Sequence, residues 1–244
     1  MPRVLVWDLP TRLFHGLLTV GVLCAFAIAQ FAGEHSSLFP FHSMLGVIVG
    51  VMVVLRIVWG FIGTRYACVV SFLFSPLAVI EYLKGVVTGV GGRYVGHNPG
   101  SSYAIFLMLG LTLVVATSGL LMSGGNEAVA EMHSIAAYAL IGVVIIHILG
   151  VILHTIRYRE NITLSMVTGR KDAEAVDGIP SAAPMAGGVF ALAAVLLAGG
   201  LYHNYDAAGR RTTVPVIGTV IQLGEAEGEQ GQVPGSPHRD EDDD

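Results

Sequence analysis

The chain has 244 residues, of which 53% are apolar and only 13% are charged, and its mean hydropathy is +0.68. Soluble globular proteins carry about 25% charged residues. The composition therefore excludes a soluble enzyme, and a disordered chain would need the opposite bias. A net charge of −5 and an isoelectric point of 6.0 argue against a nucleic-acid-binding protein. What remains is an integral membrane protein.

The cysteine content narrows the class further. Cys24 and Cys68 are too few and too far apart for a disulfide framework or a zinc site. The sequence contains no CxxCH motif, which excludes a covalently attached c-type haem. The sequence is instead rich in histidine, with nine residues of this type.

Five stretches are long and apolar enough to cross a bilayer, whose hydrocarbon core needs about 20 helical residues. They cover residues 13–33, 41–63, 103–123, 132–156 and 184–204, approximately. The first is too long for the apolar part of a cleavable signal peptide. The sequence thus predicts an all-α membrane protein, built as a four-helix transmembrane bundle with a fifth transmembrane helix at the C-terminal side.

One further apolar segment, residues 66–80, is too short to span and contains Pro76, which breaks or kinks a helix. We expect an amphipathic helix over about 75–87 that lies at the membrane interface. If this segment crossed the bilayer, the sides of all later loops would be inverted.

The distribution of basic residues predicts the orientation. With five spans, the short loops 34–40 and 124–131 contain no Lys or Arg, and the opposite side collects ten basic residues. Those ten are Arg3, Arg12, Arg56, Arg65, Lys84, Arg93, Arg157, Arg159, Arg170 and Lys171. Because basic loops stay in the cytoplasm, we expect a multi-pass protein of the bacterial inner membrane with its N-terminus cytoplasmic and its C-terminus periplasmic.

The sequence divides into three parts. Residues 1–172 form the four-helix bundle, residues 173–205 a cytoplasmic linker and the fifth span, and residues 206–244 a disordered periplasmic tail. Between Glu225 and Asp244 there are eight acidic residues and one arginine, Arg239. Such a tail either attracts a cationic redox partner or only adds solubility.

Histidines within the spans are the main functional signal, since ionisable groups in a bilayer are costly. Residues 132–156 contain His133, His147 and His154, and their spacing places all three on roughly one face of a helix. By depth, His42 lies level with His133 near the periplasmic side, and His15 lies level with His147 near the cytoplasmic side. A single intramembrane histidine would be a packing residue, but two facing pairs indicate a binding site.

Two pairs of histidines at two depths are what two low-spin, bis-histidine haems b require. A structural zinc would need its ligands at one depth. His154 is the alternative to His147 as the inner ligand, or else a contact of a haem propionate or a quinone. Gly46 and Gly150 give space for a porphyrin or for helix packing.

The remaining charged and polar candidates receive simpler interpretations. Arg56 follows His42 by fourteen residues, so it lies on the same helix face at the depth of the inner pair. We expect it to neutralise a propionate of the inner haem, unless it reaches the cytoplasmic surface instead. The other histidines are expected to be solvated or interfacial: His35, His97, His203 and His238.

Several motifs in order resemble the prokaryotic cytochrome b-561 family, which includes the cytochrome b subunits of nickel–iron hydrogenases. The resemblance covers about residues 4–170 and rests on VWDLPTRLFH, HSMLG with LRIVWG, GHNPGSSY, EMHSIAAYALIGVVIIH and RYRENITLSMVTGRK. It implies two b-type haems, held at the positions of His15, His42, His133 and His147. It also implies electron transfer between membrane quinone and a periplasmic partner, either a cytochrome c or a dehydrogenase or hydrogenase.

Two other functions remain open at this point. The same haems could serve a terminal reductase or oxidase that acts on ferric iron or superoxide. Alternatively, the chain could be a haem-free transporter or membrane anchor, which would need an acidic residue paired within the spans. The first four spans contain none.

Overall fold

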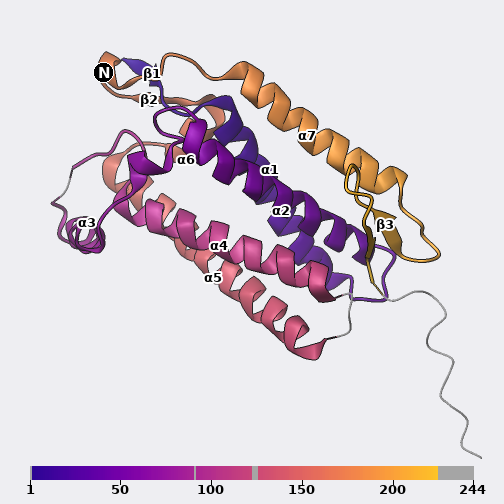
Figure 1. Ribbon diagram of the computed structural model, residues 1–244. Coiled ribbons are helices and arrows are strands. Elements are labelled where there is room, and N and C mark those ends of the chain that lie inside the picture. The colour runs from indigo at the N-terminus through magenta and orange to yellow at the C-terminus, as the bar shows by residue number, and fades with distance from the viewer. Residues whose placement is uncertain (1, 91, 123–125, 225–244) are drawn as a thin grey trace, which may run out of the picture.

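A computed structural model describes residues 2–90, 92–122 and 126–224 (Figure 1). Five long helices have the length and apolar character of membrane spans. They are α1 (Leu9–Phe31), α2 (Phe39–Ile62), α4 (Pro99–Leu121), α5 (Glu127–Tyr158) and α7 (Pro184–His203). The predicted fold class, an all-α membrane protein with five spans, is confirmed.

Capping residues and prolines define where these helices begin. The Asp8 side chain accepts a hydrogen bond from the Thr11 amide at the start of α1, and Asn98 forms a capping box with Ser101 at the start of α4. Asn126 caps α5 through the amides of its first turn. Proline occupies the first turn of α1, α2, α4 and α7, where its missing N–H costs nothing.

The spans pack as two antiparallel pairs, α1 with α2 and α4 with α5, joined through contacts between α2 and α4. Helix α7 lies along α1 and α2, away from α4 and α5 (Figure 1). Phe14, Met52 and Phe190 form the buried centre of the contact among α1, α2 and α7. The fifth helix is therefore an addition to one side of the four-helix bundle.

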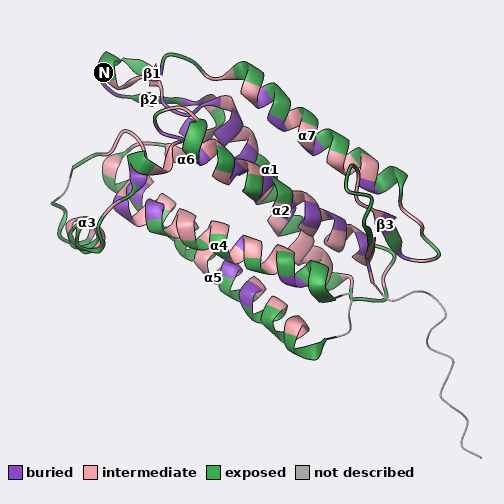
Figure 2. Ribbon diagram, in the orientation of Figure 1, coloured by how far each residue is buried: buried purple, intermediate pink, exposed green. Residues whose placement is uncertain are grey.

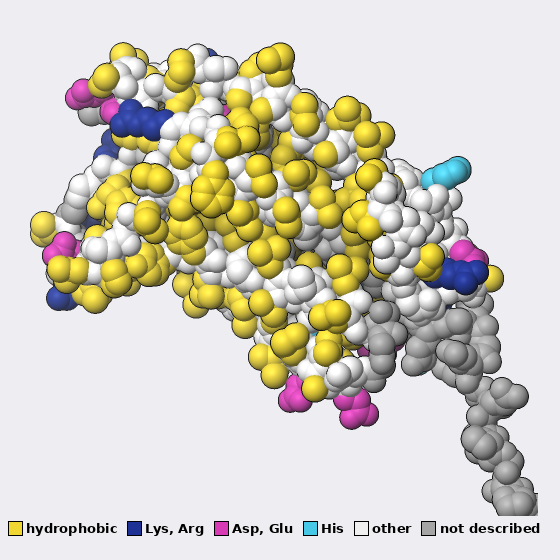
Figure 3. Space-filling model, viewed as in Figure 1, with side chains coloured by type: hydrophobic (Ala, Val, Ile, Leu, Met, Phe, Trp, Pro, Cys, Tyr) yellow, Lys and Arg dark blue, Asp and Glu magenta, His cyan; other side chains and the backbone are white. Residues whose placement is uncertain are grey.

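The outer surface of the bundle is apolar. Most outward-facing residues of the spans are exposed in the isolated chain, as Figure 2 shows. Figure 3 shows hydrophobic side chains along the length of the bundle, with the Lys, Arg, Asp and Glu side chains near its two ends. This distribution is that of a multi-pass membrane protein.

The shorter elements lie at the ends of the spans. At the end of the bundle that contains the N-terminus, β1 (Arg3–Leu5) pairs antiparallel with β2 (Arg170–Asp172). Trp7 donates from Nε1 to Ser165 Oγ (3.1 Å) in α6 (Ile162–Thr168), which fixes this end. The remaining turns are the 3₁₀ helices η1 (Val69–Phe72) and η3 (Ala175–Asp177).

The segment expected at the interface forms α3 (Pro76–Thr88), capped by Ser75. Thirteen residues of helix extend for about 20 Å, which is shorter than the hydrocarbon core. In Figure 1, α3 is seen nearly along its axis while the spans run across the view, so it lies across their direction.

The C-terminal part differs from the expectation. We expected disorder from residue 206, whereas β3 (Arg211–Thr213) and β4 (Val220–Gln222) form an antiparallel hairpin. Leu223 and Leu201 are fully buried against Met44 and Val47 of α2, so the hairpin has an apolar core of its own. Residues 225–244, which contain the acidic tail, lie outside the described residues.

This packing predicts that Leu223→Ala detaches the hairpin. Removing a fully buried leucine costs about 2–5 kcal/mol, which should raise the local opening equilibrium about 30-fold or more. The rate of trypsin cleavage after Arg210 and Arg211 measures that opening. Val176→Ala, a change at an exposed residue of η3, is the control and should leave the rate unchanged. Equal cleavage rates in both variants would contradict the packing.

Candidate functional site

The clearest feature of the site is a pair of facing imidazoles from two helices. His42 of α2 and His133 of α5 have ring centroids 6.1 Å apart, with an angle of 73° between the ring planes. A metal ion held between two imidazoles needs two metal–nitrogen bonds of about 2 Å each, which places the ring centroids about 6 Å apart. The structure thus brings together the first histidine pair that the sequence predicted.

Hydrogen bonds orient both rings. Nδ1 of His42 donates to the carbonyl of Ala25 in α1 (2.8 Å). Nδ1 of His133 donates to the carbonyl of Val115 in α4 (3.0 Å) and lies 3.2 Å from Ser118 Oγ. Metal-binding histidines typically donate their second ring N–H to a carbonyl, which fixes the tautomer. This leaves both Nε2 atoms free to bind a metal.

Small residues beside this pair leave room. A Cβ atom at Gly119 would lie 3.3 Å from Cε1 of His133, so glycine allows that ring to approach α4. Sequence reasoning missed Gly119 because its role depends on a contact between helices. At Gly46 and Gly150, an added Cβ would meet nothing within 4 Å, so neither glycine serves helix packing.

The second predicted pair lies near the other end of the bundle. His15 of α1 and His147 of α5 lie close enough to interact electrostatically. His147 lies fourteen residues from His133, which corresponds to about 21 Å along the helix. The two pairs therefore occupy different depths, as the sequence predicted.

His154 has different surroundings. Its Nε2 lies 3.6 Å from a carboxylate oxygen of Glu160, and its ring lies 4.6 Å from that of Tyr158. Arg93 (3.2 Å) and Lys171 (3.3 Å) also contact the Glu160 carboxylate. This ionic cluster borders a cavity of about 380 Å³ that is also lined by basic residues of β1 and β2.

Arg56 is buried, and it points toward the loop that follows α2. It donates from Nη2 to the carbonyl of Ala67 (3.1 Å). Asp8, which precedes the first span, lies close enough to interact electrostatically with Arg56. Asp8 itself is buried and accepts hydrogen bonds from Trp59 Nε1 (3.0 Å) and Thr64 Oγ1 (2.6 Å). The sequence did not indicate this interaction, because Asp8 lies before the first predicted span.

His97 corrects a second expectation, that it is solvated or interfacial. Its ring lies between those of Trp7 (4.7 Å) and Phe72 (4.6 Å). Its Nδ1 is buried and has no hydrogen-bond partner among the described residues. Burial, with Arg56 and Lys171 nearby, lowers the pKa of His97 to about 3, so the ring is neutral.

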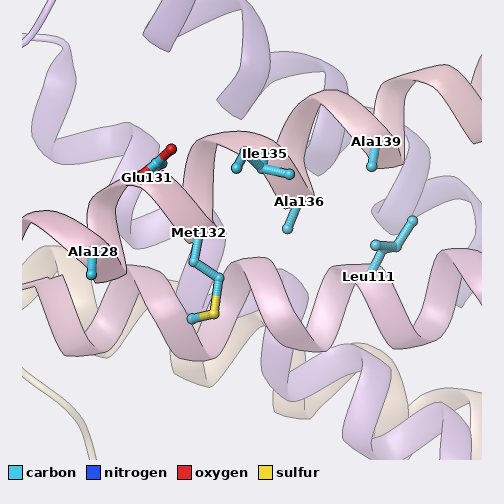
Figure 4. Close-up of a pocket in the computed structure, with 7 residues that line it drawn as sticks. All are labelled: Leu111, Ala128, Glu131, Met132, Ile135, Ala136 and Ala139. Carbon is cyan, nitrogen blue, oxygen red and sulfur yellow. The ribbon is translucent and has the colours of Figure 1, made fainter.

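A shallow groove on the outside of the bundle is separate from the histidine pairs. Figure 4 shows it between α4 and α5, lined by Leu111 of α4 and by α5 residues that include Met132 and Ile135. Its volume is about 380 Å³. Glu131 is the one ionisable side chain among its lining residues, and none of the paired histidines lines it.

Comparison with known proteins identifies the family. The family model described as prokaryotic cytochrome b561 matches residues 6–169, which is most of the chain and includes all four paired histidines. The chain belongs to the prokaryotic cytochrome b561 family. It is thus a multi-pass membrane protein of a b-type cytochrome family, whose members take part in electron transport.

Three relatives of this cytochrome are each named as a probable Ni/Fe-hydrogenase B-type cytochrome subunit. The one from Bradyrhizobium diazoefficiens is 25% identical over 217 residues, covering 70% of this chain and 86% of the relative. The one from Rhodobacter capsulatus is 23% identical, covering 69% of this chain and 81% of the relative. The one from Rhizobium leguminosarum bv. viciae is 22% identical, covering 69% of this chain and 88% of the relative. No solved structure matches the chain.

The described residues fit the b-type haem that the family implies. The donor set is right, because paired imidazoles with engaged Nδ1 atoms are haem axial ligands in other cytochromes. The orphaned Nδ1 of His97 and the open space beside Gly46 also fit a large, partly polar group. When bound, a haem supplies reversible one-electron redox chemistry at its iron.

The ionic cluster predicts a pH dependence of stability. Burial raises the pKa of Glu160, but His154, Lys171 and Arg93 outweigh it and lower the value from 4.5 to about 2. The ionised carboxylate therefore stabilises the fold above pH 4.5, and this contribution is lost as the pH falls from 4.5 toward 2. The shift corresponds to about 3 kcal/mol.

Glu160→Gln should therefore lower the midpoint of thermal unfolding at pH 7, and the difference from the original protein should shrink as the pH falls below 4.5. Scanning calorimetry of the purified protein in detergent across this pH range measures it. Glu174→Gln, outside the cluster, is the control. A difference that stays constant with pH would contradict the role of the charge.

Proposed function

We propose that this protein is a di-haem electron-transfer cytochrome, with one haem b held by His42 and His133 and a second by His15 and His147. The facing of His42 and His133 at 6.1 Å, with both Nδ1 atoms bound to carbonyls, carries the proposal. Two imidazoles on each iron leave no open coordination position. The haems would therefore be low spin and suited to electron transfer.

At the inner site, His147 is favoured over His154 as the ligand. His147 is the electrostatic neighbour of His15, whereas His154 lies against Glu160 and Tyr158. His154 would then contact a polar ligand such as a quinone head group, together with Glu160 and Tyr158, which line the cavity at the N-terminal end of the bundle.

Arg56 and His97 would hold the propionates of the inner haem. A guanidinium has five N–H donors, and the described contacts of Arg56 use one of them, on Ala67. His97 has a buried Nδ1 to offer beside Arg56 and His147. Both groups lie at the depth of the inner pair, where two carboxylates of a haem need partners.

We further propose the electron path. The quinone pool would exchange electrons with the inner haem, and a redox partner at the periplasmic side would exchange electrons with the outer haem. The relatives named as hydrogenase cytochrome subunits favour a partner of the hydrogenase type over a soluble cytochrome c. The excess of basic residues at the end that contains the N-terminus supports a cytoplasmic N-terminus.

The first experiment is a reduced-minus-oxidised absorbance spectrum and a haem assay of the purified protein. His133→Ala should remove the outer haem and His147→Ala the inner one, and each variant should keep about half the haem per chain. The control is His203→Ala, which changes a histidine outside both pairs. Two haems in either ligand variant would contradict the assignment, and loss of the inner haem only in His154→Ala would favour the other pairing.

The second experiment tests Arg56. Arg56→Leu removes a positive charge beside the inner haem, so the midpoint potential of that haem should fall by on the order of tens of millivolts, or its occupancy should drop. The outer haem should be unaffected and acts as an internal reference in the potentiometric titration. Arg65→Leu, at an exposed position in the following loop, is the control. Unchanged potentials and occupancies in Arg56→Leu would show that Asp8 and Ala67 alone account for this arginine.

A further inference from the structure

The turn of the C-terminal hairpin lies beside a membrane-spanning helix rather than beyond it. Thr212 Oγ1 in β3 donates to the carbonyl of Leu201 in α7 (2.7 Å). A Cβ atom at Gly200 would overlap the ring of Pro215, so the turn passes directly over that glycine. Figure 1 shows the hairpin folding back along the C-terminal part of α7.

The depth of the turn follows from these contacts. Pro215 lies directly over Gly200, which precedes the end of α7 at His203 by three residues. Three helical residues correspond to about 4.5 Å. The hairpin tip, residues 214–219, therefore reaches to a level within the span.

The composition of the hairpin tip suits lipid and not water. All residues from 212 to 223 are uncharged, and the tip presents Val216, which is fully exposed, and Ile217, which is 74% exposed. Val216 also has a φ of 71°, a conformation that turns in water normally fill with Gly, Asn or Asp. A β-branched apolar residue at this position is costly unless its side chain gains from its surroundings.

Three of the five backbone amides in the hairpin tip donate to carbonyls within the tip. The amide of Val214 donates to the carbonyl of Thr219 (2.8 Å), and that of Gly218 to the carbonyl of Val214 (3.0 Å). The amide of Ile217 donates to the carbonyl of Pro215 (2.8 Å), and Pro215 has no N–H to satisfy. Internal pairing of this kind is what a turn needs where water is scarce.

We propose that the hairpin tip inserts into the bilayer leaflet that surrounds the C-terminal end of α7, with Val216 and Ile217 in contact with lipid. The adjoining surface of α7 is lipid-facing as well, since Val195 and Leu196 are exposed and apolar. Insertion removes two large apolar side chains from water.

The other end of the hairpin is fixed to the bundle. Arg210 is 5% exposed and donates to the carbonyls of Glu34 (3.0 Å) and His35 (2.8 Å) in the loop before α2. That loop leads directly to Phe39, whose ring stacks on His42 at 5.3 Å. The hairpin thus links the lipid, α7 and the segment that carries His42.

Site-directed spin labelling of the full-length protein tests the proposal. In a Cys24→Ser, Cys68→Ser background, Val216→Cys is labelled with a nitroxide, and the protein is reconstituted into phospholipid nanodiscs. Collisions with oxygen, which concentrates in lipid, and with a water-soluble nickel chelate are each measured relative to nitrogen. Ala208→Cys, an exposed position in the loop before β3, is the matched control, and Ile217→Cys repeats the measurement at the tip.

The expected result is a ratio of oxygen to nickel accessibility at positions 216 and 217 that is several-fold higher than at position 208. Equal ratios at all three positions would place the tip in water and overturn the proposal. Exclusion of both reagents from the tip would also overturn it, because it would indicate a protein contact such as a second copy of the chain. If Val216→Cys does not fold, the Ile217→Cys variant decides between these outcomes.

Discussion

Polar groups within the hydrocarbon layer have to find partners inside the protein, because lipid offers none. This constraint governs the spans of the chain. His42 reaches a carbonyl of α1, His133 a carbonyl of α4, and Arg56 a carbonyl of the loop after α2. Each bond crosses from one helix or loop to another, so the same contacts that satisfy the polar groups also hold the helices in register.

The histidine site depends directly on that register. A haem ligand must have one ring nitrogen free and the other engaged, and the ring must point at the metal. Here the tautomers of His42 and His133 follow from carbonyls of helices α1 and α4, neither of which carries the histidine itself. Four helices therefore cooperate in orienting one histidine pair, as cofactor sites within helix bundles require.

The two ends of the bundle are built differently. At the N-terminal end, the β1–β2 ribbon and the Glu160 cluster border a cavity lined by charged groups, and His154 contacts Glu160. At the other end, the β3–β4 hairpin adds an apolar cover beside His42, fixed by Arg210 and Leu223. The two ends therefore offer different surfaces, a charged cavity at one and a folded hairpin at the other.

The sequence by itself determined the class of protein, the five spans and the two depths of histidine, because length, hydropathy and helical spacing are local properties. It also placed His42 level with His133, which the ring contact between them agrees with. Only the tertiary structure decided the contacts that join distant segments. It brought Asp8 near Arg56, buried His97 between Trp7 and Phe72, and folded residues 211–222 onto α2 and α7. Such contacts depend on how the helices and loops pack in three dimensions, which the period of a single helix does not specify.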